Sequence, residues 1–116
     1  MEAVSVVLLT DDLMFGSKVE SMIRAAGAEP VFAAAPLEAL AAIERFDARL
    51  LIVDLVSDGF DGTTLPAAAG VPVVGYYAHT DDDTRRAALA AGFDTVVPRS
   101  RMMREGDALI ASILSR

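Results

Sequence analysis

The sequence predicts an α/β fold, a doubly wound five-stranded parallel sheet with helices on both faces. Two observations predict it. Short apolar runs alternate along the chain with segments whose apolar residues recur at helical spacing. The runs are also mostly apolar throughout, which is typical of parallel strands that are covered on both faces. Since no linker, repeat or low-complexity tract interrupts this alternation, residues 1–116 are expected to form a single domain.

Five short, mostly apolar segments are the predicted strands. They are residues 4–10, 30–34, 48–55, 71–77 and 95–98. Within the fourth strand, Gly75 is expected to permit the close approach of another element. Tyr76 and Tyr77 are adjacent in the same strand, so their side chains are expected on opposite faces of the sheet.

The helices are predicted from apolar residues three and four positions apart and from residues that start or stop helices. These signals lie in residues 15–27, 36–43, 63–70, 80–92 and 109–114. Gly27 is expected to end the first helix, and Pro36 to open the second. The third segment can hold at most about two helical turns, and Pro66 limits even that. A Thr or Asp cap, followed by acidic residues in the first turn, is expected to start the fourth.

Composition excludes several classes of function. The chain has no Cys and one His, which excludes a disulfide framework and thiolate or His-rich metal sites. A net charge of −7 argues against nucleic acid as a direct partner, because binding phosphates needs a basic surface. Neither a signal peptide nor an apolar run of about 20 residues is evident, so a cytoplasmic protein without a membrane partner is expected.

Three carboxylates follow the predicted strands. Asp11 and Asp12 come directly after the first strand, and Asp54 lies at the end of the third. In doubly wound sheets, ligands bind beyond the carboxyl ends of the strands. If these two strands are neighbours, the three carboxylates converge on one pocket. The alternative is structural: Asp11 or Asp12 caps the first helix, and Asp54 caps a turn.

Such a pocket would need a cation. Carboxylates crowded together repel each other and raise each other's pKa values, and a hard divalent cation relieves that repulsion. Mg²⁺ prefers oxygen ligands, usually one or two carboxylates with waters and a phosphate oxygen. The cluster therefore indicates a Mg²⁺-assisted phosphoryl site in which one Asp is free to act as nucleophile.

Three segments of the sequence resemble the receiver domains of bacterial two-component response regulators, the CheY-like superfamily. They are "VVLLTDDLM", "LLIVDLVSDGFDG" and "AHTDDDTRRAALAAGFDTVV". The resemblance covers nearly the whole chain and implies a stand-alone receiver of flavodoxin-like fold, with strand order 2-1-3-4-5 and a shortened third helix. It further implies that Asp54 is the phosphoacceptor. The Mg²⁺ ligands would be Asp12, Asp54 and the backbone carbonyl of Val56, with Asp11 acting through water.

The chain departs from the family at the residues that report phosphorylation. Tyr77 stands at the position of the switch Thr or Ser, and Val96 at the position of the switch aromatic. Arg99 aligns with the family's Lys, where it would contact the phosphoryl group with a different reach and geometry. A one-residue gap would instead align Val97 with that Lys. The usual relay is therefore expected to be absent, and the domain to be an atypical receiver.

These features predict a signalling protein, not an enzyme. A sensor histidine kinase or a downstream protein would be its partner, and a homodimer is an alternative. A second hypothesis is a pseudo-receiver that docks or dimerises without phosphorylation. An Asp-nucleophile phosphohydrolase is disfavoured, because Val56 stands where such enzymes carry a second Asp.

Two further features leave alternatives open. In residues 100–104, Arg101 and Arg104 flank two Met residues, which suits either a protein contact or the start of a helix with Met in the core. His79 follows the fourth strand, where a polar loop residue is more often structural or solvated than functional.

Overall fold

The computed structural model describes residues 3–57, 59–62, 64–78 and 80–116. Asp58 and His79, and the functional alternatives attached to His79, lie outside these residues. The five strands are β1 (Val4–Leu9), β2 (Ala28–Ala33), β3 (Leu50–Asp54), β4 (Val73–Tyr77) and β5 (Thr95–Pro98). The helices between and after them are α1 (Leu13–Ala25), α2 (Pro36–Arg45), α3 (Pro66–Ala69), α4 (Asp82–Ala90) and α5 (Arg99–Leu114).

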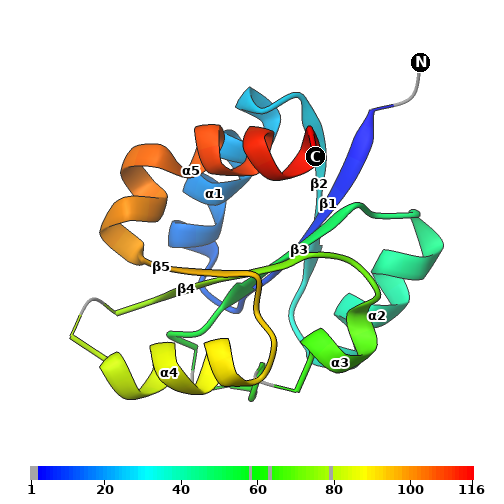
Figure 1. The fold of residues 1–116 in the computed structure, drawn as a ribbon. Helices are drawn as coiled ribbons and strands as arrows, with labels where there is room; N and C mark the ends of the chain where they lie inside the picture. The colour runs from blue at the N-terminus through cyan, green and yellow to red at the C-terminus, as the bar shows by residue number, and fades with distance from the viewer. Residues whose placement is uncertain (1–2, 58, 63, 79) are drawn as a thin grey trace.

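The strands form one parallel sheet in the order β2-β1-β3-β4-β5, which confirms the predicted order (Figure 1). Every residue of β3 and of β4 is buried, as strands covered on both faces require. β1 pairs with β3 in a register that sets Leu9 beside Val53. The chain segments that follow these two strands therefore leave the sheet side by side.

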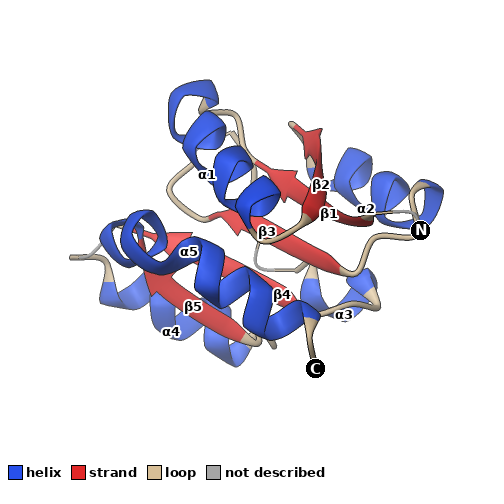
Figure 2. Ribbon diagram, turned by 90° about the horizontal axis from the view of Figure 1, so that it is seen from above, coloured by secondary structure: helices blue, strands red, loops and turns tan. Residues whose placement is uncertain are grey.

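Helices cover both faces of the sheet (Figures 1 and 2). α1 and α5 pack on one face, where their apolar residues join Val6, Leu8, Tyr76 and Val97 in a core cluster. α2, α3 and α4 cover the other face. Burying these apolar faces is the main force that holds the layers together.

The element boundaries follow local signals. The helix α1 is followed by Gly27, whose φ of +86° is a left-handed conformation that favours glycine. Pro36 is the first residue of α2, and the Asp81 carboxylate caps α4 by accepting from the Thr84 amide. With four residues, α3 is a single turn, as Pro66 predicted. In the part of the chain that the structure describes, no helix is both long enough and apolar enough to span a bilayer.

Gly75 permits a close approach, as predicted. A Cβ atom there would lie 2.6 Å from Leu55 Cδ1 and 3.0 Å from the Phe93 ring. Any side chain at this position would therefore push the loop after β3 away from the sheet. The residue helps to set where that loop runs over the carboxyl end of the strands.

Candidate functional site at the carboxyl ends of β1 and β3

Asp54 ends the central strand β3 and is 1% exposed. A buried carboxylate is costly unless hydrogen bonds compensate it. Here Oδ1 accepts from the Val56 amide at 2.9 Å, and Oδ2 accepts from the Thr10 hydroxyl at 2.7 Å. Both oxygens of the predicted phosphoacceptor are thus engaged by the protein itself.

Thr10, which the sequence analysis did not select, is the residue that joins the two strand ends. Its hydroxyl oxygen accepts from the Asp12 amide at 3.0 Å, so its proton is free to go to Asp54. Its methyl group packs beside Gly16, where an added Cβ would lie 3.1 Å from Thr10 Cγ2. The hydroxyl orientation is therefore fixed by packing on one side and by hydrogen bonds on the other. A polar residue between an apolar strand and an acid pair was the signal that could have identified it.

Asp12 is the N-cap of α1. Its Oδ1 accepts from the amides of Met14 and Phe15, each at 3.1 Å, and its Oδ2 lies 3.0 Å from Arg99 Nη2. The Phe15 amide holds the pKa of Asp12 below its ordinary value, and the Arg99 charge and the Met14 amide act in the same direction against the opposing effect of desolvation. The expected rise in the pKa is therefore wrong for Asp12, because helix amides and a guanidinium outweigh the effect of desolvation.

Arg99, the first residue of α5, pairs with Asp12, and together with Asp11, Asp12 and Asp54 it makes up the acid pocket. Its guanidinium carbon lies 4.3 Å from the centroid of the Phe15 ring, a cation–π contact. Its Nη2 donates to Asp12, and its buried Nε has no hydrogen-bond partner among the described residues. Val97, the position of the gapped alternative, is fully buried in the apolar core.

Asp11 is exposed, and its carboxylate lies beside the loop after β3. A Cβ atom on Gly59 would be 2.6 Å from Asp11 Oδ2. Among the described residues, no three acidic or histidine side chains come together closely enough to hold a metal ion. The oxygen ligands that Mg²⁺ prefers are present, but their arrangement pairs Asp12 with Arg99 rather than forming a cage. Metal binding at Asp11, Asp12, Asp54 and the Val56 carbonyl remains a prediction.

Tyr76 lies beneath the pocket on the α1–α5 face of the sheet. Its ring packs against Phe15 with centroids 4.9 Å apart, and its hydroxyl makes no hydrogen bond of normal geometry among the described residues. Burial raises the pKa of Tyr76 well above its usual range, and the negative charge of Asp54 raises it further. A neutral phenol therefore sits beside the Asp54 carboxylate.

The two switch positions hold buried or partly buried side chains in neighbouring strands. Tyr77 is 5% exposed at the end of β4, and its register partner on β5 is Pro98. Val96 pairs with Gly75 and packs against the core on the α2–α4 face. The assignment of Tyr77 and Val96 to the switch positions stays a prediction.

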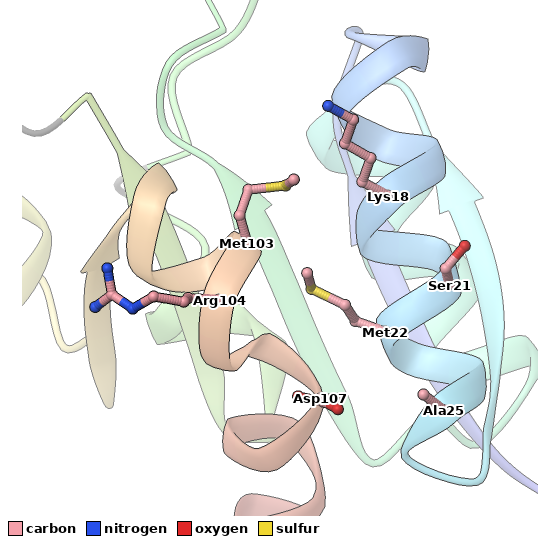
Figure 3. Close-up of a pocket in the computed structure, with 7 residues that line it drawn as sticks. All are labelled: Lys18, Ser21, Met22, Ala25, Met103, Arg104 and Asp107. Carbon is pink, nitrogen blue, oxygen red and sulfur yellow. The ribbon is translucent and has the colours of Figure 1, made fainter.

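A groove of about 390 Å³ lies between α1 and α5 (Figure 3). Its lining does not include the residues of the acid pocket. Met22 on α1 and Met103 on α5 face each other across it. Met102, the residue before Met103, is fully buried in the core and does not line the groove. Met102 thus confirms the alternative of a helix start with Met in the core, and the protein contact stays a prediction.

Of three comparisons with known proteins, only the one with solved structures found similar chains. No family model matches the sequence. No curated protein matches it either. Among solved structures, a putative response regulator from Chloroflexus aurantiacus J-10-fl is 26% identical, with a TM-score of 0.84 and coverage of 99% of this chain and 100% of that one.

Two further structures share the fold at lower identity. The receiver domain of the sensor histidine kinase PA1611 from Pseudomonas aeruginosa PAO1, which has a magnesium ion in its active site cleft, is 19% identical with a TM-score of 0.81. The match covers 99% of this chain and 100% of that one. A two-component response regulator from Clostridium difficile is 20% identical with a TM-score of 0.82, and 97% of each chain is covered. By its strand order, its five described helices and these whole-length matches, the chain has the fold of the receiver domains of two-component response regulators.

Proposed function

We propose that residues 1–116 act as one atypical receiver module in which Asp54 is the phosphoacceptor. The observation that supports this most is the place of Asp54, at the carboxyl end of the central strand and next to the strand end that carries Asp11 and Asp12. Ligands of doubly wound sheets bind at this edge. The resemblance to response regulators in fold and sequence supports this role for the carboxylate.

Phosphorylation of Asp54 would add nearly two negative charges to the pocket. Arg99 is the protein cation already held there, and a guanidinium can direct two N–H groups at phosphoryl oxygens. We propose that Arg99 contacts the phosphoryl group. Its buried Nε, which has no partner among the described residues, is a donor that a phosphoryl oxygen would satisfy.

The proposed partners are a sensor histidine kinase or a downstream protein, met in the cytoplasm. Tyr77 and Val96 lack the groups of the usual relay, so the signal would reach such a partner through changes close to the pocket. A magnesium ion occurs in the cleft of the receiver from Pseudomonas aeruginosa, and Mg²⁺ is the cofactor that we propose here. In this chain it would have to compete with Arg99 for Asp12.

The test is labelling by a small phosphodonor such as acetyl phosphate, followed by intact mass measurement. We expect the wild-type protein to gain one phosphoryl group and Asp54→Asn to gain none. Asp83→Asn is the matched control, because it removes the same charge from an exposed position on α4. Equal labelling of Asp54→Asn and the wild type would reject Asp54 as the phosphoacceptor.

A second candidate function is docking or dimerisation without phosphorylation. The closed state of the pocket favours it: Asp54 is 1% exposed, and both of its oxygens already accept hydrogen bonds. No labelling of the wild-type protein, by acetyl phosphate or by a cognate kinase, would support this alternative.

A further inference from the structure

The acid pocket already contains a positive charge. Arg99 Nη2 lies 3.0 Å from Asp12 Oδ2, and the two side chains are 36% and 39% exposed. Asp12 Oδ1 is occupied by the amides of Met14 and Phe15. Asp12 is thus balanced by donors that belong to the chain.

Three features hold the guanidinium in this place. It pairs with Asp12, it stacks on the Phe15 ring at 4.3 Å, and it projects from the first residue of α5. Phe15 is itself fixed, because it packs against Tyr76 in the core between α1 and the sheet. Stacking on a fixed ring positions an arginine before any ligand arrives, which lowers the entropy lost in making the pair.

From this arrangement we infer that Arg99 is a built-in counter-ion that occupies the place of the divalent cation at Asp12. The metal and the guanidinium need the same oxygen, Asp12 Oδ2, so a metal binds only when Arg99 leaves it. Asp12 therefore has a counter-charge in the resting protein without Mg²⁺, and the affinity of the pocket for Mg²⁺ is reduced by the competition. This inference rests on the proposed function, because that proposal identifies the pocket as the site where Mg²⁺ and the phosphoryl group bind.

The test compares Mg²⁺ affinity between variants by calorimetric or NMR titration. Arg99→Gln removes the competing guanidinium, and we expect this variant to bind Mg²⁺ about three- to tenfold more tightly than the wild type. The expected gain is modest because water screens the partly exposed pair of Arg99 and Asp12. Arg101→Gln is the matched control. Arg101 lies two residues further along α5 and pairs with Glu105, so it changes net charge equally without touching the pocket. We expect less than about a twofold change for it, because exposed charges act weakly at a distance.

Equal or weaker Mg²⁺ binding by Arg99→Gln than by Arg101→Gln would overturn the inference. A second measurement keeps it testable if Arg99→Gln does not fold. In the wild-type protein, the Arg99 Nε–H signal should shift with the same midpoint as the Asp12 amide when Mg²⁺ is added. An unchanged Arg99 signal at saturating Mg²⁺ would also overturn it. Labelling of Asp54 is measured separately, so a failure here is distinct from a failure of the phosphoacceptor proposal.

Discussion

At the residue scale, the Thr10 hydroxyl accounts for the buried charge at the end of β3. It accepts from the Asp12 amide and donates to Asp54 Oδ2, so its single proton is directed at the carboxylate. The Val56 amide serves the other oxygen. The chain thus offsets the desolvation of Asp54 with two short hydrogen bonds from its own groups.

Thr10→Val tests this contribution, because valine keeps the shape and removes the hydroxyl. We expect the free energy of unfolding to fall by about 1–3 kcal/mol, the cost of leaving a buried acceptor without its donor. Thr10→Ser is the control: it keeps the hydroxyl and loses only the methyl group that packs beside Gly16. Urea denaturation of both variants measures the effect. A Thr10→Val protein that is as stable as the wild type, and more stable than Thr10→Ser, would show that the hydroxyl does not support Asp54.

At the element scale, the pocket is where α1 and α5 begin. Asp12 caps α1, Phe15 lies in its first turn, and Arg99 opens α5. The ion pair therefore ties the N-terminal ends of two helices that also pack together further along. There, a Cβ on Gly106 would lie 2.5 Å from Met22 Sδ, so glycine permits the close contact. A change at the pocket would therefore act first on the N-terminal ends of these two helices.

The cap and the ion pair predict a pH dependence of stability. The pKa of Asp12 is lowered in the folded protein from its ordinary value of 3.8, so the carboxylate stabilises the fold above that value. The contribution is lost as the pH falls through the lower, folded-state pKa. Asp12→Asn keeps a good N-cap but removes the charge, so it should be less stable than the wild type near neutral pH.

Thermal melts of both proteins at several pH values check this expectation. The difference in stability between the wild type and Asp12→Asn should begin to shrink below about pH 4, where the Asp12 carboxylate of the unfolded chain becomes protonated before that of the folded protein. A difference that stays constant down to about pH 2 would mean that the charge of Asp12 contributes nothing to folding.

At the scale of the whole molecule, the sequence was most informative where the signals are local. The apolar runs predicted the five strands, Pro36 and Gly27 marked helix boundaries, and the place of Asp54 at a strand end indicated the site. Most boundaries lie within three residues of the prediction, as at β3, where the predicted segment 48–55 is the strand Leu50–Asp54. The exception is α5, which begins at Arg99, whereas the apolar spacing marked the helix only from Leu109.

The contacts that define the pocket could not be predicted in the same way. Thr10 and Asp54 are 44 positions apart, and Asp12 and Arg99 are 87 apart, so no local pattern joins them. The stacking of Arg99 on Phe15 depends on how α1 and α5 pack on the sheet. The sequence therefore indicated three repelling carboxylates, whereas in the folded chain each oxygen of Asp12 and Asp54 has its own donor.

The most direct test of the account is an NMR titration with beryllofluoride, a mimic of the phosphoryl group. If Asp54 is the phosphoacceptor of a receiver without the usual relay, shifts should be confined to the pocket, at Thr10, Asp12, Asp54 and Arg99. Arg99→Ala should weaken binding by about 1.5–3 kcal/mol, the value of a charge-assisted hydrogen bond. The absence of any shift at Asp54 would contradict the phosphoacceptor role. Large, cooperative shifts that reach Leu109 on α5 would contradict a local response.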